Sequence, residues 1–164
     1  MRTLTVALAV LVALALVPAP RAGQEKVYAI DGYRVDIAVQ PDGSLDVREN
    51  ITVQFIQGAF TFGYRTIPHR GFDDLVLEGV TSPSWTIYPA TVGYEWDWGG
   101  RYRIEWTFPA ASETVIPFEL RYRVTNALGY RDDTNVLDWD AIGNQWDVPI
   151  QDVEVRVSLP PGSS

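Results

Sequence analysis

The sequence contains no cysteine, which excludes disulfides, a thiol nucleophile, a lipidated N-terminal cysteine and a cysteine-ligated metal site. Histidine occurs once, as His69. A general base or a metal ligand is conceivable there, because an unperturbed imidazole titrates near neutral pH. With no second histidine to share a metal ion, we interpret His69 as a surface-loop residue and expect no metal site and no cofactor.

A serine hydrolase is also disfavoured, because no Gly-x-Ser-x-Gly segment occurs and the few serines lie in turns or near the end of the sequence. Positive charge is scarce: 13 basic residues face 21 acidic ones, and the formal charge is −8. Nucleic acids and anionic lipid surfaces both favour basic patches, so we expect neither as a partner.

Carboxylates are plentiful, and paired acids could serve glycoside hydrolysis or hold calcium. However, no Asp-x-Asp-x-Asp-Gly loop occurs, and acids beside Gly, Asn and Thr are typical of ordinary turns. The acids considered are Asp73, Asp74, Asp132, Asp133, Asp138, Asp140 and Asp147. We therefore predict no catalytic residue and no enzyme, and the acidic pairs leave calcium as an open alternative.

Long hydrophobic runs are absent except at the N-terminus, where an apolar stretch covers residues 4–17 after Arg2. A run of about 14 residues is short for a membrane span, which needs about 20. The positive residue, the short apolar core and the closing small residue are typical of a secretory signal. We predict a signal peptide at 1–22 and a mature protein starting near Gly23, with an uncleaved anchor as the alternative.

In the rest of the sequence, apolar residues often recur at every second position, as in Tyr33, Val35, Ile37 and Val39. This period of two is typical of strands with one buried face. The segment Pro41-Asp42-Gly43-Ser44 predicts a hairpin turn between the first two long strands. Strands are expected near residues 33–39, 45–55, 64–67, 75–80, 85–88, 92–97, 101–108, 114–124 and 153–159.

Eight or nine short strands separated by turn signals predict an all-β fold, an antiparallel β-sandwich over residues 23–159. Residues 57–72 are interpreted as an ordered loop around the short strand, and 135–146 as irregular with one possible helical turn. Residues 160–164 are interpreted as the start of a linker, in a chain expected to continue further.

Glu49 shares its strand phase with Val47 and Ile51 and should therefore point into the core. An unpaired buried carboxylate is costly, so a cation must neutralise it. We predict a structural ion pair with Arg65, whose planar guanidinium can grip a carboxylate through two hydrogen bonds. The alternative is a bulge near Asn50 that turns Glu49 outward.

Six tryptophans are many for this length, and most are interpreted as core residues, Trp96 and Trp106 among them. Around Gly99 and Gly100 the side chains favour a three-residue loop, Trp98-Gly99-Gly100. That register pairs Trp96 with Tyr102 and Glu95 with Arg103, and it leaves Trp98 at an exposed tip. Trp98, with Tyr94 and Trp96, is therefore the candidate contact for a ligand such as a sugar ring or a membrane interface.

Three features together resemble a known family: Val47-Arg48-Glu49 in a strand, the Tyr64-Arg65 pair, and the spacing of Trp139, Gly143 and Trp146 before the last strand. The chain resembles the N-terminal region of bacterial predicted membrane proteins called domain of unknown function 2207. The resemblance implies an extracytoplasmic β domain joined to membrane helices, and it implies no chemistry. Attachment to the membrane would then come from a missing C-terminal segment or from an uncleaved N-terminal one.

The function expected from the sequence is a non-catalytic module of the cell envelope, for adhesion, scaffolding or sensing, whose partner is an envelope protein or a glycan. The alternative is a carbohydrate-binding module that uses Trp98 and its aromatic neighbours.

Overall fold

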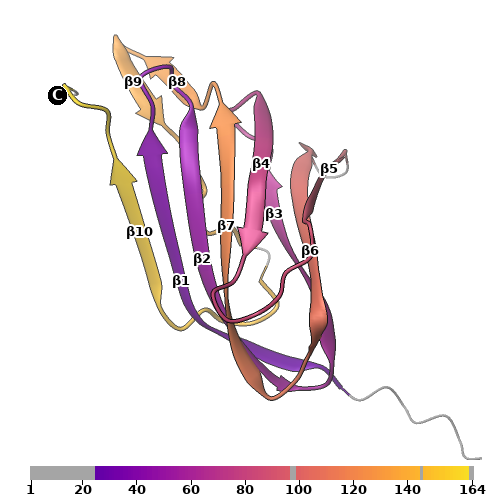
Figure 1. Ribbon diagram of the computed structural model, residues 1–164. Coiled ribbons are helices and arrows are strands. Elements are labelled where there is room, and N and C mark those ends of the chain that lie inside the picture. The colour runs from indigo at the N-terminus through magenta and orange to yellow at the C-terminus, as the bar shows by residue number, and fades with distance from the viewer. Residues whose placement is uncertain (1–24, 97–98, 145, 163–164) are drawn as a thin grey trace, which may run out of the picture.

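The computed structural model describes residues 25–96, 99–144 and 146–162. The signal segment predicted at 1–22 therefore lies outside the described residues. The described part of the chain forms ten β-strands (Figure 1), which confirms the all-β class. These are β1 (Val27–Val39), β2 (Leu45–Gln57), β3 (Phe60–Pro68), β4 (Asp74–Thr81), β5 (Thr91–Glu95), β6 (Arg101–Ala111), β7 (Thr114–Thr125), β8 (Leu128–Arg131), β9 (Thr134–Leu137) and β10 (Val153–Ser158).

Two sheets pack face to face and form a sandwich (Figure 1). The larger sheet has the strand order β10-β1-β2-β7-β4, and the smaller one has the order β3-β6-β5. A separate hairpin, β8-β9, projects beyond one end of the larger sheet. Neighbouring strands are antiparallel except β10, which runs parallel to β1. The antiparallel sandwich is thus confirmed, with one parallel edge strand added.

The β1-β2 hairpin closes where the turn residues predict it. Backbone hydrogen bonds run from Gln40 N to Ser44 O at 2.8 Å and from Gly43 N to Gln40 O at 3.0 Å. Gly43 has φ +78°, a backbone conformation that glycine adopts without steric strain. Asp42 Oδ1 accepts a hydrogen bond from Ser44 N, as in an Asx turn.

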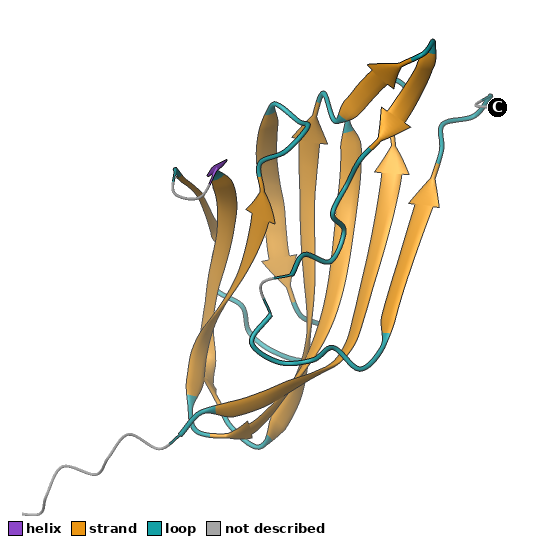
Figure 2. Ribbon diagram, turned by 180° about the vertical axis from the view of Figure 1, so that it is seen from behind, coloured by secondary structure: helices purple, strands orange, loops and turns teal. Residues whose placement is uncertain are grey.

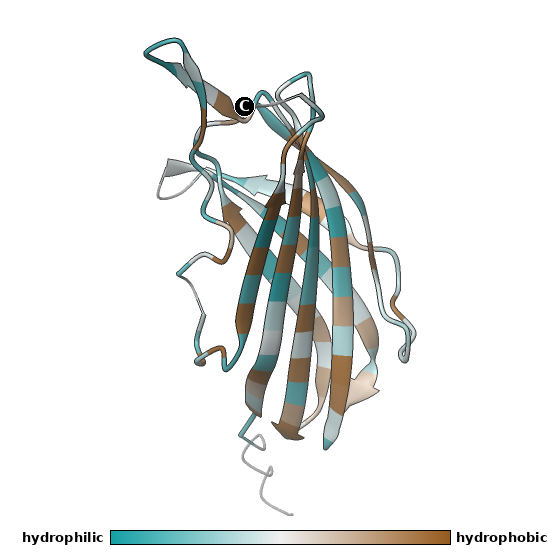
Figure 3. Cartoon of the chain, turned by 90° about the vertical axis from the view of Figure 1, so that its left-hand side faces the viewer, coloured by the Kyte–Doolittle hydropathy of each residue, from teal (hydrophilic) through white to brown (hydrophobic). Residues whose placement is uncertain are grey.

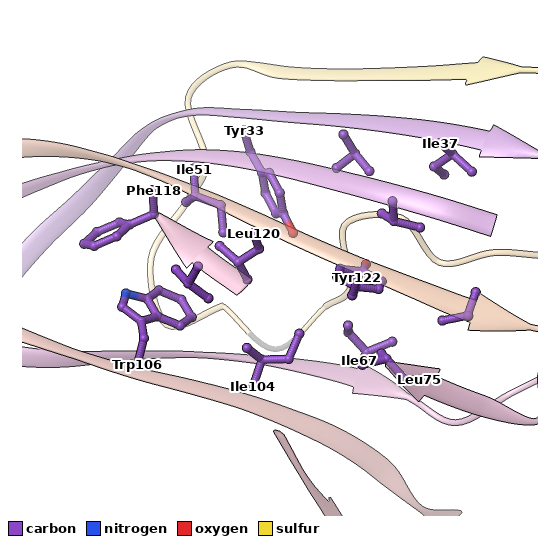
Figure 4. Packing of buried hydrophobic residues seen from close by; sticks show 14 of the residues in the cluster. Tyr33, Ile37, Ile51, Ile67, Leu75, Ile104, Trp106, Phe118, Leu120 and Tyr122 are labelled. Atoms are coloured by element: carbon purple, nitrogen blue, oxygen red, sulfur yellow. The ribbon is translucent and has the colours of Figure 1, made fainter. Parts of the chain in front are cut away.

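The core lies between the two sheets, where alternate residues of each long strand point inward. Figure 3 shows this alternation as bands of opposite hydropathy along the larger sheet, and Figure 4 shows inward side chains from both sheets in contact. Among the buried residues are Tyr33, Val35 and Ile37 of β1, Leu45, Val47 and Ile51 of β2, Phe118, Leu120 and Tyr122 of β7, Ile67 of β3, and Ile104 and Trp106 of β6. Trp106 is therefore a core residue, as its strand phase predicts.

Three local predictions need correction. Residues 85–88 form no strand: two prolines flank the segment, and its backbone is tied to β6 by the hydrogen bond from Tyr88 N to Thr107 O. The short strand expected at 64–67 is longer, because β3 extends over nine residues and replaces most of the expected loop. Residues 134–137 form strand β9 and not a helical turn, because the turn at Asp132 and Asp133 closes a hairpin with β8.

The predicted register of the β5-β6 hairpin is wrong. Glu95 lies opposite Arg101 and Tyr94 opposite Tyr102, so the loop comprises the five residues 96–100. Both registers pair opposite charges, but only the observed one places Tyr94 against Tyr102, with ring centroids 5.0 Å apart. Trp96 consequently leaves the strand and is 85% exposed, so its assignment to the core is also wrong. Trp98, at the predicted tip, lies outside the described residues.

The smaller sheet covers only part of the larger one, and the segment 138–152 runs past the remaining part (Figure 2). Trp139 packs against Phe72, with ring centroids 5.5 Å apart, and Trp146 packs edge-on against Tyr33 at 5.4 Å. This irregular segment therefore covers β1 on the side that the three-stranded sheet leaves open.

Candidate functional site

Glu49 lies at the centre of the sandwich and is 0% exposed. Strand β2 pairs with β7 without a register shift from Leu45 to Phe55, so the inward phase of β2 continues through Glu49. The bulge considered near Asn50 is absent from β2. The register shift in this region falls on β1, between Ile30 and Gly32, where it leaves the direction of Glu49 unchanged.

Arg65 meets Glu49 from the opposite sheet. Its backbone pairs with Ile104, an inward-facing position of β6, so its side chain also points inward and is 4% exposed. Arg65 Nε lies 3.0 Å from Glu49 Oε2 and 3.3 Å from Oε1. The ion pair predicted from the strand phase is therefore present, although both hydrogen bonds come from Nε and not from two nitrogens of the fork.

The terminal nitrogens of Arg65 donate to backbone carbonyls instead. Nη1 donates to Thr66 O at 2.5 Å, and Nη2 donates to Ala141 O at 3.2 Å. Ala141 belongs to the segment 138–152, so Arg65 connects β2, β3 and this segment through one planar group. A guanidinium with all its nitrogens engaged is the arrangement that makes a buried cation tolerable.

Two tyrosines complete the coordination of Glu49, and the sequence interpretation missed both. Tyr33 OH donates to Oε2 at 2.5 Å, and Tyr122 OH donates to Oε1 at 2.6 Å. Tyr33 comes from β1 and Tyr122 from β7, the two neighbours of β2 (Figure 4). Tyr33 lies opposite Ile51 and Tyr122 opposite Val47, so each is a diagonal neighbour of Glu49. A tyrosine on an inward phase beside a buried acid is the signal that could have found them.

The electrostatics of this centre keep Tyr33, Tyr122 and Arg65 protonated. Burial, followed by the charge of Glu49, raises the pKa of both Tyr33 and Tyr122 well above the usual value. Burial, the largest single effect, lowers the pKa of Arg65, but the charge of Glu49, the two tyrosines and the hydrogen bond to Glu49 together outweigh burial and raise the pKa. The two phenols stay neutral donors and the guanidinium stays charged, which suits a fixed structural centre better than proton transfer.

The segment 138–152 encloses the centre from the remaining side. Gly143 has φ +76°, and a Cβ built on it would lie 3.1 Å from Arg65 Nη1. The guanidinium also lies 5.7 Å from the centroid of the Trp146 ring. The segment therefore approaches Arg65 closely enough that a side chain at position 143 would crowd it.

Each of the three sequence motifs thus contributes to one buried centre, through Glu49, Arg65, and the pair Gly143 and Trp146. A family model described as the predicted membrane protein (DUF2207) N-terminal domain matches residues 29–164. The chain belongs to this family. The DUF2207 match begins just before the inward-facing part of β1 and includes every residue of the Glu49 centre.

No curated protein matches the DUF2207 chain. In the part of the chain that the structure describes, no helix is long and apolar enough to cross a membrane.

His69 differs from its interpretation as a surface-loop residue, because it is half-buried among aromatic rings. Its Nδ1 lies 2.8 Å from Tyr94 OH, and its Nε2 lies 2.8 Å from Phe72 O. The ring also packs edge-on against Tyr102, with centroids 5.4 Å apart. Both nitrogens are thus engaged in holding the loop after β3 against the smaller sheet of the DUF2207 domain.

In the observed hairpin, two of the residues predicted to contact a ligand, Tyr94 and Trp96, have different surroundings. Tyr94 is partly buried, and its hydroxyl contacts His69 and occupies the place where a Cβ on Gly100 would stand. Trp96 extends from the hairpin end and packs edge-on against Tyr94, with ring centroids 4.8 Å apart. Of the three aromatic candidates, Trp96 is the one that the structure shows to be largely exposed.

Proposed function

We propose that this DUF2207 domain is a non-catalytic module on the extracytoplasmic side of a membrane protein, serving adhesion, scaffolding or sensing through contacts with an envelope partner. Membership of a predicted membrane protein family and the signal-like N-terminal sequence support this location. A partner surface is supported by one observation above all, the exposure of Trp96 at the end of the β5-β6 hairpin.

The enclosure of the two most reactive-looking groups supports a non-catalytic role. Glu49 has both oxygens occupied by donors and no contact with solvent. His69 has both ring nitrogens engaged. A general base must reach the proton that it abstracts, and neither group is free to do so without local rearrangement.

A glycan is the second candidate partner, and it is favoured specifically by the Trp96 indole beside the Tyr94 ring. An exposed indole offers an apolar face for stacking on a sugar ring and a polar N–H at its edge. Loss of an exposed side chain far from the core should leave the fold intact, so Trp96 can be removed without confounding binding with stability.

The experiment is a pull-down of envelope proteins and a tryptophan-fluorescence titration with cell-wall glycans, each with the parent protein and with Trp96→Ala. Trp85→Phe is the matched control, because Trp85 is tied to Pro109 O at 3.3 Å and lies away from the hairpin end. Binding that is lost in Trp96→Ala and kept in Trp85→Phe supports the proposal. Equal binding by both variants would exclude the hairpin as the partner surface.

The side of the membrane needs its own test. A reporter enzyme that is active only after export, fused after residue 159, should be active in cells. An inactive reporter in a correctly folded fusion would contradict the extracytoplasmic location.

A further inference from the structure

A cavity of about 230 Å³ lies between β3 and the strands β1 and β2. Both sheets contribute to its mostly apolar walls, which include Ile51, Val53, Phe55, Phe60, Phe108 and Phe118. For comparison, an apolar cavity of about 150 Å³ in another protein holds benzene. The space is therefore large enough for part of an organic ligand, and its walls favour an apolar one.

One buried polar group in the cavity wall has no partner. Trp106 is 4% exposed and lines the cavity, and its Nε1 has no hydrogen-bond partner among the described residues. A buried donor without an acceptor typically costs about 1–3 kcal/mol, so such groups are uncommon in folded proteins. Among the described residues that line the cavity, Trp106 Nε1 is thus the one buried N–H donor without a partner.

Gly63 accounts for the position of this indole. It is the β3 register partner of Trp106, and a Cβ there would lie 2.6 Å from Cζ2 and 3.1 Å from Nε1. The ring therefore extends over the place where a side chain at position 63 would stand, toward the edge strand β3 and the cavity beside it. Figure 4 shows the indole rising from β6 into the space between the sheets, on the side of Phe118.

The cavity is open to solvent at its rim. Three polar residues that line it, Lys26, Asn144 and Asp147, are themselves exposed. Lys26 Nζ lies 5.2 Å from the centroid of the Phe60 ring. The pKa of Tyr28 is raised, mainly by burial and secondly by the negative charge of nearby Asp147. A ligand can thus place an apolar part inside and a hydrated end among mixed charges.

We propose that this cavity binds a fatty acyl chain whose carbonyl oxygen accepts a hydrogen bond from Trp106 Nε1. The aliphatic chain matches the phenylalanine-rich walls, and one acceptor matches the one free donor. A sugar carries hydroxyls around its ring and would leave most of them unpaired against these walls. The site is distinct from the exposed Trp96 surface and does not depend on the proposed function.

The test uses 2-bromoundecanoic acid, whose bromine stands beside the carbonyl and therefore near Trp106, because bromine quenches an indole that it contacts. In the full chain, titration should quench part of the tryptophan fluorescence saturably, whereas undecanoic acid without bromine should not quench. Calorimetry with the same acid then gives affinity independently of fluorescence. Trp106→Phe removes the donor and should weaken binding about tenfold.

Val53→Phe fills the cavity with an aromatic ring and should abolish binding. Trp85→Phe and Trp96→Ala leave the cavity intact and should bind the acid as the parent does. The outcome of the cavity test is therefore independent of whether Trp96 binds a partner. Thermal unfolding checks that each variant is folded. If Val53→Phe is not, the smaller Val53→Met takes its place, with a weaker but measurable loss of affinity.

A second arm uses phosphatidylcholine vesicles with brominated acyl chains. Quenching by both probes, or by the free acid alone, identifies an acyl chain taken from solution, and quenching by vesicles alone identifies one taken from a bilayer. Each of these supports the proposal when Val53→Phe removes the effect. No saturable quenching by either probe, or quenching that persists in a folded Val53→Phe variant, would overturn it.

Discussion

Arg65 Nη1 lies 3.1 Å from the point where a Cβ on Gly143 would stand. This close approach relates a buried cation of the smaller sheet to an irregular segment more than 70 residues later in the sequence, and it requires glycine twice over. The backbone of Gly143 is in the left-handed region at φ +76°, and the space beyond its Cα is taken by the guanidinium.

Gly143→Ala should therefore lower the free energy of unfolding by about 1–2 kcal/mol, through the strained backbone and the displaced guanidinium. Urea unfolding measures this. Gly129→Ala is the matched control, because the nearest atom to its added Cβ is Val136 O at 3.7 Å, an ordinary contact. Equal stability of the two variants would mean that segment 138–152 does not press on Arg65 in solution.

Removal of either member of the Glu49–Arg65 pair should be strongly destabilising, because it leaves the other charge buried and unneutralised. We expect a loss of about 3–5 kcal/mol for Glu49→Ala or Arg65→Ala, and a double variant no less stable than the worse single one. Chemical denaturation of all three gives the coupling. Arg34→Ala removes a surface partner of Glu154 and should scarcely shift the midpoint. Additive losses would show that the buried pair is not coupled.

The tyrosine hydroxyls predict a dependence on alkaline pH. The pKa of Tyr33 and Tyr122 is raised on folding, so their contribution to stability is complete below the unfolded value of about 10 and is lost as pH rises beyond it. The free energy of unfolding should accordingly decrease above about pH 10. In Tyr33→Phe the slope should be shallower, whereas Tyr130→Phe, at an exposed position, should keep the parent slope. Identical slopes in all three proteins would contradict the assignment.

The β5-β6 register can be tested by cross-linking, since the sequence has no cysteine to compete. Glu95 and Arg101 are directly opposite, whereas the register predicted from the sequence would place Glu95 opposite Arg103. The double substitution Glu95→Cys with Arg101→Cys should form a disulfide under mild oxidation, and Glu95→Cys with Arg103→Cys should not, because diagonal positions are too far apart. Mass spectrometry of the oxidised proteins distinguishes them, and the reverse pattern would restore the three-residue loop.

Strand phase alone could predict the most unusual feature of the core. A charge at Glu49 between apolar residues of one phase requires a neutralising group, and Arg65 is a nearby cation on a β segment. The tyrosines could not be assigned as its partners without the strand order, because Tyr122 is 73 residues away in sequence and becomes a neighbour only through the β2-β7 pairing.

Registers and irregular segments were less predictable for physical reasons. Two hairpin registers around Gly99 and Gly100 pair the charges about equally well, and a contact from outside the hairpin, Tyr94 with His69, distinguishes them. The segment 138–152 has no repeating hydrophobic pattern, because it covers part of one face of the larger sheet through single side chains. Trp139 and Trp146 contact Phe72 and Tyr33, respectively, and these contacts do not follow from a strand period or a helix period.

The parallel pairing of β10 with β1 has a mechanical consequence. Both strands run in the same direction and are adjacent, so the start of β1 and the end of β10 point to opposite ends of the domain (Figure 1). A pulling force applied between residues 27 and 158 would load the β1-β10 hydrogen bonds in shear, all together and not one at a time. We expect such a shear arrangement to resist extension better than a hairpin whose hydrogen bonds break one at a time.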